Sequence, residues 1–318
     1  MKTAIITGIS GQDAAYLTKY LIKKKYNIIG TTRSYNIGKL SKLEYLGVYK
    51  NVIIEEIDLL DFTSILNLIK KYQPDEIYNL SAQSSVGLSF NQPIGTFTYN
   101  TLSVINLLEA IKIYNKNIRF YQASSSEMYG NVEKLPINEK TPMHPKSPYG
   151  ISKAAAHWIS INYRESFGIF VGIGILFNHE SILRSKNFFI KKVIKEALEI
   201  KFGERKKLRV GNINIKRDFG YAPKYVEAIW KILQQDEPSE FIICSGVSIS
   251  LKDVVYYIFD KLDLDKRLIE IDPALFRPNE IDDIYGDNSK AKKILKWEYS
   301  LSFYDVLDMI IEEELALR

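Results

Sequence analysis

The first half of the chain alternates short apolar runs with longer segments in which apolar residues recur every three or four positions. The apolar runs predict β-strands at Thr3–Ile6, Ile28–Thr32, Val52–Ile57, Glu76–Asn79, Arg119–Ala123 and Phe170–Leu176. The longer segments predict helices at Ala14–Lys25, Phe62–Tyr72, Thr96–Tyr114 and Tyr149–Phe167. Because strands and helices alternate, we predict an α/β fold with a doubly wound parallel sheet. Ligands of such sheets bind beyond the carboxyl ends of the strands, so functional residues are expected directly after strands.

After about Phe177 the alternation becomes irregular. The pattern there predicts an edge strand at Lys207–Val210 and helices at Lys186–Phe202, Leu251–Leu262, Ser289–Leu295 and Phe303–Leu315. We therefore expect two domains. Residues 1–177, with a returning segment near 218–245, would form the sheet domain, and residues 178–217 and 246–318 a smaller C-terminal lobe.

Composition narrows the class of protein only a little. Of the 318 residues, 46% are hydrophobic and 25% are charged, which is ordinary for a globular protein. The formal net charge of +5 is spread over many lysines, so it favours a phosphate-bearing ligand without indicating nucleic acid. The single cysteine, Cys244, lies in an apolar run and fits a reducing compartment. No apolar run reaches the length of about 18 residues that a membrane span requires, so we expect a cytoplasmic protein.

A glycine-rich loop follows the first predicted strand. The chain reads Gly8-Ile9-Ser10-Gly11-Gln12-Asp13-Ala14, and a helix is predicted from Ala14 onward. Gly8 permits a tight turn, Gly11 lets backbone N–H groups approach a pyrophosphate, and the small Ala14 suits close packing of helix on strand. The loop therefore predicts a dinucleotide-binding domain; an ordinary strand–helix turn is the alternative.

The end of the second predicted strand bears on the choice of dinucleotide. Proteins that bind NAD usually place an acidic residue there, against the ribose 2′-hydroxyl. Residues 30–36 contain no acid, and Arg33 is suited to pair with the 2′-phosphate of NADP, so we expect NADP rather than NAD; a solvated loop arginine is the alternative. After the third strand, Asp58, next to Leu59, can accept a hydrogen bond from an adenine amino group or cap the following helix.

Tyr149 and Lys153 form a candidate catalytic pair. They are four residues apart in Ser147-Pro148-Tyr149-Gly150-Ile151-Ser152-Lys153, so a helix places them on one face. A tyrosine with its ordinary pKa of about 10 is a poor base at neutral pH, but a nearby ammonium group and a nicotinamide cation would stabilise the phenolate. The pair could then take a proton from a sugar hydroxyl while hydride leaves the same carbon. A purely structural pair is the alternative.

Glu127 follows the fifth predicted strand, after Ser124, Ser125 and Ser126. Hydroxyl groups at this strand end can hydrogen-bond the reacting hydroxyl and Tyr149. A carboxylate here can remove the acidic proton next to a newly formed ketone and then protonate a departing hydroxyl group. A simple dehydrogenase or epimerase needs no such group, so Glu127 favours dehydration. A helix-entry residue is the alternative.

Together these segments resemble the GDP-mannose 4,6-dehydratase family of extended short-chain dehydrogenases/reductases. The similarity runs nearly end to end, and its most selective parts are Gln12-Asp13 and Phe177-Asn178-His179-Glu180-Ser181. It extends to residues 79–84, 119–124, 147–150, 162–168, 216–220, 271–273 and 276–278. The resemblance implies a Rossmann domain with a C-terminal substrate lobe. It also implies a hydro-lyase that converts a GDP-linked manno-configured sugar to its 4-keto-6-deoxy product by internal hydride transfer through NADP.

The resemblance also implies roles for individual residues. Tyr149, supported by Lys153, would deprotonate the C4 hydroxyl, Ser125 would hydrogen-bond the C4 oxygen, and Glu127 would take the C5 proton and help to expel the C6 hydroxyl as water. The cofactor would be held by Gly8, Ser10, Gly11, Gln12, Asp13, Arg33, Asp58, Leu59, Leu80, Ser81, Tyr149 and Lys153. The substrate would be held by Ser84, Asn178, Lys192, Arg217, Arg277 and Glu280. The resemblance implies no metal site, and it implies a homodimer or homotetramer.

Some positions depart from the family pattern. Ser125 stands where the family usually has Thr, and residues 182–185 and 190–192 differ from its usual sequence. These departures leave two GDP-linked substrates open, mannose and a manno-configured heptose with one more carbon. A rival activity on the same scaffold is a C4 dehydrogenase or epimerase that eliminates no water.

Overall fold

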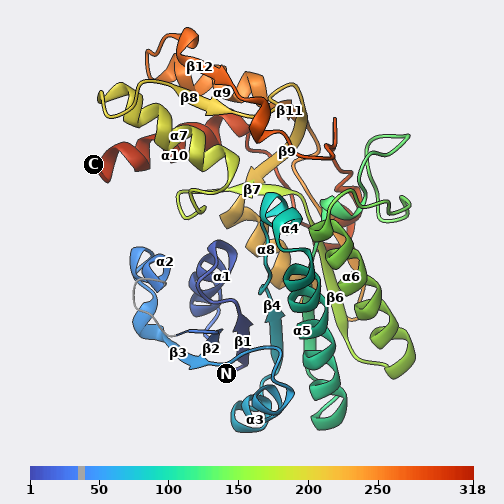
Figure 1. Ribbon diagram of the computed structural model, residues 1–318. Coiled ribbons are helices and arrows are strands. Elements are labelled where there is room, and N and C mark those ends of the chain that lie inside the picture. Colours follow the sequence, from blue (N-terminus) through green and yellow to red (C-terminus); the bar gives the residue numbers. More distant parts are fainter. Residues whose placement is uncertain (35–39) are drawn as a thin grey trace.

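The computed structural model describes residues 1–34 and 40–318; residues 35 and 36, part of the segment expected to select the cofactor, lie outside the described residues. Its largest sheet has seven strands in the order β10-β6-β5-β4-β1-β2-β3, all paired in parallel (Figure 1). These strands are β1 (Thr3–Thr7), β2 (Asn27–Thr32), β3 (Val52–Glu56), β4 (Glu76–Asn79), β5 (Arg119–Ser125), β6 (Val171–Leu176) and β10 (Glu240–Ile243).

Helices cover both faces of this sheet. On one face α1 (Gln12–Lys23) packs against α8 (Ala222–Leu233); on the other lie α3 (Phe62–Tyr72), α5 (Pro93–Tyr114) and α6 (Pro148–Phe167). Neighbouring strand residues enter different cores, because side chains of a strand alternate between its two faces. Ile6 belongs to the core beside α1 and α8, whereas Ile5 belongs to the core beside α3 and α5. The predicted α/β, doubly wound parallel sheet is therefore confirmed.

The six strands predicted from apolar runs are all present, with ends that differ by at most two residues. The seventh strand, β10, was not predicted as a strand. It lies in the segment expected to return near 218–245 and pairs with β6, while α8 of the same segment packs on α1. This segment therefore completes the sheet and the helical layer that covers it.

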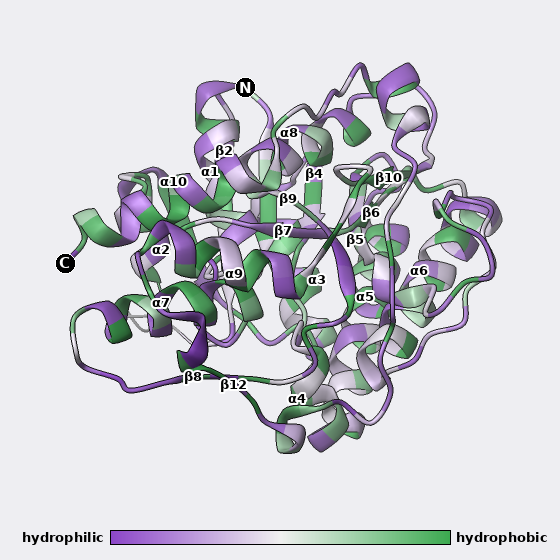
Figure 2. Ribbon diagram, turned by 90° about the horizontal axis from the view of Figure 1, so that it is seen from above, coloured by the Kyte–Doolittle hydropathy of each residue, from purple (hydrophilic) through white to green (hydrophobic). Residues whose placement is uncertain are grey.

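The later part of the chain forms smaller sheets and amphipathic helices. Strands β11 (Ser248–Ser250), β9 (Lys216–Tyr221) and β7 (Asn178–Glu180) form one sheet, and β8 (Leu208–Val210) pairs with β12 (Ile269–Ile271). Three longer helices belong to this part: α7 (Phe189–Lys201), α9 (Leu251–Lys261) and α10 (Phe303–Ala316). Hydrophobic and polar residues alternate along each of them (Figure 2). The helix expected at Ser289–Leu295 is a π-helical turn, Ala291–Leu295. Among the described helices, which include the short α2 (Ser41–Tyr45) and α4 (Val86–Asn91), none has the length and apolar character to cross a membrane.

The strand order reverses between β1 and β4. From β1 the chain moves outward through β2 and β3, then returns to β4 on the other side of β1 and continues to β5 and β6. Open α/β sheets bind ligands at such a point, beyond the carboxyl ends of the strands. Thr7 joins the two strand ends here: its hydroxyl donates to Asn79 Oδ1 at 2.7 Å and accepts from the backbone N–H groups of Leu80 and Ser81, each at 3.1 Å.

Candidate functional site

A cavity of about 700 Å³ opens at this reversal point, between the sheet and the later lobe. It is bordered by the loops after β1, β2, β4, β5 and β6 and by segments of the lobe. Most of the residues predicted for the site line it: Gly8, Ser10, Gly11, Gln12, Asp13, Arg33, Leu59, Leu80, Ser81, Ser84, Ser125, Glu127, Tyr149, Lys153, Asn178, Arg217, Arg277 and Glu280. Two predicted residues, Asp58 and Lys192, do not line it.

The glycine loop forms a close cradle at one end of the cavity. Gly8 has φ +67°, and a Cβ atom there would lie 2.9 Å from the Cα atom of Ser81, so any larger residue would separate the ends of β1 and β4. Gly11 closes the turn through its N–H, which donates to the carbonyl of Gly8 at 2.8 Å. Within the described residues, no side chain caps the start of α1, so its first N–H groups can bind an anion. This cradle fits a pyrophosphate.

Arg33 lies at the same end, exposed at the end of β2. Its guanidinium group stands over the ring of Tyr99 at 4.6 Å, and the Tyr99 hydroxyl lies 2.6 Å from Ser81 Oγ. Stacking on a ring leaves the edge of the guanidinium group free for a phosphate. Asp58, by contrast, is exposed and accepts a hydrogen bond from Leu60 N at 3.0 Å, which is a local turn contact.

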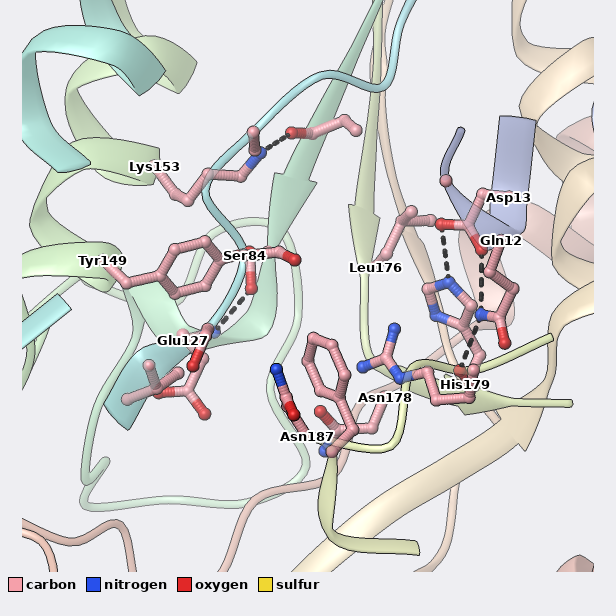
Figure 3. A pocket seen from close by; sticks show the side chains of 18 of the residues that line it. Gln12, Asp13, Ser84, Glu127, Tyr149, Lys153, Leu176, Asn178, His179 and Asn187 are labelled. Atoms are coloured by element: carbon pink, nitrogen blue, oxygen red, sulfur yellow. Dashed lines mark hydrogen bonds and ion pairs between the residues drawn. The ribbon is translucent and has the colours of Figure 1, made fainter. Parts of the chain in front are cut away.

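The first turns of α6 position the candidate catalytic pair, Tyr149 and Lys153. Ser147 caps this helix by accepting a hydrogen bond from Gly150 N at 3.0 Å, which places Tyr149 in the first turn and Lys153 one turn later. A Cβ atom at Gly150 would lie 2.6 Å from the carbonyl oxygen of Glu127, so only glycine lets the helix approach that strand end so closely. The close approach brings Tyr149 beside Glu127 in the cavity wall, as Figure 3 shows.

Tyr149 and Lys153 are both buried, and burial changes both of their pKa values. Burial raises the pKa of Tyr149 to about 12, although a hydrogen bond with Ser125 opposes the change. Burial lowers the pKa of Lys153 to about 8, and its ammonium group donates to the carbonyl of Ala123. At neutral pH the protein alone therefore keeps Tyr149 protonated, with Lys153 mostly charged. The expected stabilisation of the phenolate by Lys153 together with a nicotinamide cation stays a prediction, and in the protein alone burial outweighs the effect of Lys153 on the pKa of Tyr149.

The substrate end of the cavity holds two carboxylates, Glu127 and Glu280, and two arginines, Arg217 and Arg277. Glu127 is half-buried, and its backbone N–H donates to Ser125 Oγ at 3.3 Å. Arg217 is buried on β9, where its Nη1 donates to the carbonyl of Ile281 at 2.6 Å while its Nη2 lies 3.8 Å from Glu280. Arg277 is exposed at the rim. The Nη1 of Arg217 is thus engaged by the fold, and its Nη2 faces Glu280.

Several cavity residues were not predicted from the sequence, and one predicted residue points elsewhere. Tyr99, Arg184 and Asn187 line the cavity, although no local motif marks them. Tyr99 reaches it from α5, far along the chain from the strand ends. Lys192 instead donates from Nζ to the carbonyl of Arg209 at 2.8 Å. The substrate role expected for Lys192 stays a prediction.

Comparisons with known proteins agree with this geometry. The family model described as GDP-mannose 4,6 dehydratase matches residues 5–310. GDP-mannose 4,6 dehydratase 1 of Arabidopsis thaliana is 39% identical over 327 residues, covering 99% of this chain and 90% of that protein. GDP-mannose 4,6 dehydratase of Cricetulus griseus is 36% identical, covering 99% of this chain and 92% of the relative.

Solved structures of more distant proteins share the fold. The dTDP-glucose 4,6-dehydratase of Bacillus anthracis, solved with NAD, superposes with a TM-score of 0.87 at 22% identity, covering 99% of this chain and 97% of that one. RMD from Pseudomonas aeruginosa, solved with NADPH, gives 0.83 at 24% identity and covers both chains fully, at 100% each. The near-complete match to the family model and the identity to full-length relatives establish that this chain belongs to the GDP-mannose 4,6-dehydratase family.

Proposed function

We propose that this protein is a GDP-sugar 4,6-dehydratase, a hydro-lyase that converts a manno-configured substrate to its 4-keto-6-deoxy product. The observation that carries the proposal is that Ser125, Glu127, Tyr149 and Lys153 line the same cavity as the glycine loop. A tyrosine–lysine pair would suffice for oxidation at C4. The carboxylate of Glu127 beside them supplies the acid–base group that elimination of water requires.

We propose that Tyr149 accepts the proton of the C4 hydroxyl while Ser125 hydrogen-bonds the C4 oxygen. A bound nicotinamide would supply the positive charge that stabilises the phenolate, accept hydride from C4 and return it to C6. The ammonium group of Lys153, which donates to the carbonyl of Ala123, adds further positive charge to the site. Once C4 is a ketone, the C5 proton is acidic; Glu127 takes it and delivers a proton to the departing C6 hydroxyl.

We further propose that Asn178, Arg217, Arg277, Glu280 and Ser84 hold the GDP moiety. All five line the cavity, on the lobe side or in the loop after β4. Arginine suits a diphosphate because its planar donor groups bind two oxygens at once. The family relatives of Arabidopsis thaliana and Cricetulus griseus are named for GDP-mannose, which supports a GDP-linked sugar.

The function is tested by the mass of the product. Purified protein incubated with GDP-mannose, and separately with a GDP-linked manno-heptose, should convert one of them to a product lighter by one water. A product lighter only by two hydrogens would establish the C4 dehydrogenase alternative. An isomer of unchanged mass would establish an epimerase. The substrate that is converted faster decides between hexose and heptose.

We infer that the cofactor is NADP. The support is Arg33 at the end of β2, which stacks on Tyr99, at a position where an acidic residue would indicate NAD. Structures that share this fold contain NAD in one case and NADPH in another, so the fold alone does not choose. We expect the purified protein, once denatured, to release NADP(H), identified by chromatography. Release of NAD(H) alone would contradict the inference, and Arg33→Ala should weaken NADP binding more than NAD binding.

We propose a homodimer or homotetramer assembled through α5 and α6. These helices expose large apolar side chains in the single chain: Ile94, Phe97, Leu102, Ile113, Ile151, Trp158 and Phe167. Many large apolar side chains exposed on two neighbouring helices favour a protein interface there. A cytoplasmic location, expected because no apolar run reaches the length of a membrane span, stays a prediction.

The assembly is tested by placing a charge on that surface. Trp158 is 58% exposed, so Trp158→Glu should leave the fold intact and dissociate the oligomer. Light scattering of the wild-type protein should give a multiple of the chain mass, and the variant should give the mass of one chain. Val247→Glu is a matched control, because Val247 is 70% exposed and lies outside α5 and α6. A wild-type protein that is monomeric at all concentrations would contradict the proposal.

A further inference from the structure

His179 occupies an unusual position between the cofactor loop and the substrate lobe. It is buried in β7, next to Asn178, and its ring faces the first turn of α1. Its Nε2 lies 2.9 Å from Asp13 Oδ2, and its Nδ1 lies 2.7 Å from the carbonyl oxygen of Phe177. Figure 3 shows this pair on the opposite side of the pocket from Tyr149 and Lys153.

Both contacts of the ring are to hydrogen-bond acceptors. A backbone carbonyl cannot donate, and an ionised carboxylate accepts only. A neutral imidazole has one N–H and can satisfy only one of them, whereas an imidazolium ion satisfies both. Asp13, the partner of His179, also stays ionised. Burial would raise the pKa of Asp13, but the charge and hydrogen bond of His179 outweigh it and lower that pKa to about 2.

The pair belongs to a closed set of contacts between α1 and the segment 177–181. Gln12 donates from Nε2 to Asp13 Oδ1 at 3.1 Å and to the carbonyl of His179 at 3.2 Å. Its Oε1 accepts from Ser181 Oγ at 2.7 Å. The side chains of Gln12 and Asp13 therefore tie the helix that begins at the glycine loop to the strand that carries Asn178.

Several other groups face this pair. Glu180 and Arg184 lie beyond β7, with Arg184 Nε 3.4 Å from Glu180 Oε1. From α2, Lys42 donates to the carbonyl of Ser10 at 2.9 Å. From α8, the ring of Tyr225 lies 4.6 Å from that of His179. Burial and Arg184 oppose a charge on His179, but Asp13 dominates and the pKa of His179 is raised.

We propose that His179 is held as an imidazolium ion and that its ion pair with Asp13 is a positioning element. The pair fixes the glycine loop against the substrate strand and neutralises a carboxylate that would otherwise repel a pyrophosphate. Its effect on cofactor binding rests on the proposed function; the charge state of the ring does not. In this proposal His179 contacts no reacting carbon and no catalytic side chain. It acts through Asp13 and Asn178.

The charge state is measured by nitrogen NMR of the side chains. The chain has three histidines, so a selectively labelled sample gives three ring systems. His144, which is exposed, is assigned with His144→Gln, and His157 with Ser124→Ala, because Ser124 Oγ lies 3.1 Å from His157 Nδ1. His179 then needs no substitution. We expect both of its ring nitrogens to carry protons at neutral pH. A neutral ring at neutral pH would overturn the proposal.

The positioning role is measured by cofactor affinity. His179→Gln removes the positive charge opposite Asp13 and leaves only the hydrogen bond from Gln12, so NADP(H) affinity should fall by at least about ten-fold. The double variant Asp13→Asn/His179→Gln removes the repulsion as well and should recover much of that loss. A purely structural role would make the double variant as weak as or weaker than the single one, and that result would overturn the proposal.

The pH dependence of cofactor affinity tests the proposal independently, without a substitution at His179. Because the folded-state pKa of His179 is raised, its contribution to stability and positioning is present in full below the ordinary histidine pKa, about 6.5. It is lost as pH rises through the raised value. Cofactor affinity should therefore fall more steeply over that range in the wild-type protein and in His144→Gln than in His179→Gln, in which only the titration of Lys153, with a pKa of about 8, remains. If dehydration is absent while the ring is doubly protonated, the proposed function fails and the charge assignment stands.

Discussion

Glu127→Gln is expected to stop the reaction after oxidation at C4. The amide has nearly the shape of the carboxylate, and Tyr149, Lys153 and Ser125 remain in the cavity wall. The C4 hydroxyl can therefore still lose its proton to Tyr149. The amide cannot accept the C5 proton, so elimination of water should stall. A general base typically contributes about 10²–10⁴-fold, and turnover to the 6-deoxy product should fall by that order.

The stalled state has a spectroscopic signature. In a single turnover with bound oxidised cofactor, the near-ultraviolet absorbance of reduced nicotinamide should rise and persist in Glu127→Gln, up to one equivalent. In the wild-type protein it should be transient. Glu133→Gln is the matched control: Glu133 is exposed in the loop after Glu127 and does not line the cavity, so its turnover should stay at the wild-type level. Normal 6-deoxy product from Glu127→Gln would remove Glu127 from the elimination step.

The parts of the fold that depend on local pattern were predicted well from the sequence. Strand β4 and helix α3 have the predicted bounds, because apolar periodicity and flanking polar residues define both ends. The short strands β7, β9 and β11 were missed. Their sequences, Asn-His-Glu, Lys-Arg-Asp-Phe-Gly-Tyr and Ser-Ile-Ser, contain no apolar run, so only their partners across the sheet define them as strands.

The site residues also fall into two groups: those that a local sequence feature predicts and those that only the folded structure defines. The glycine loop, the tyrosine–lysine spacing and Glu127 each depend on a local feature, and the structure brings them to one cavity. The orientation of Gln12 and Asp13 toward His179 depends on a contact between residues 166 positions apart, which no local motif reports. Lys192 likewise turns to a neighbouring carbonyl. The pKa of Tyr149 follows from its burial, a property of the assembled fold.

The second large effect is expected from Tyr149→Phe, which removes the buried hydroxyl of Tyr149. Phenylalanine fills the same space, so the fold and the position of Lys153 should be kept. Without the hydroxyl, the group that hydrogen-bonds Ser125 and is assigned to accept the C4 proton is gone, and the first hydride transfer should be slowed by about 10²–10⁴-fold. In the single-turnover experiment Tyr149→Phe should give no rise in reduced-nicotinamide absorbance, in contrast to Glu127→Gln.

The pH dependence of that first step separates loss of a base from loss of packing. Burial holds the pKa of Tyr149 at about 12 in the protein alone, and the cofactor's positive charge should lower it. Because the phenolate is the reactive form, the wild-type rate should rise with pH until Tyr149 is ionised, whereas the residual rate of Tyr149→Phe should lack this rise. Tyr129→Phe is the control, since Tyr129 is fully buried, outside the cavity lining, and its hydroxyl has no hydrogen-bond partner among the described residues. If Tyr149→Phe keeps both the rate and its rise with pH, another group is the base, because a phenyl ring can neither ionise nor take a proton.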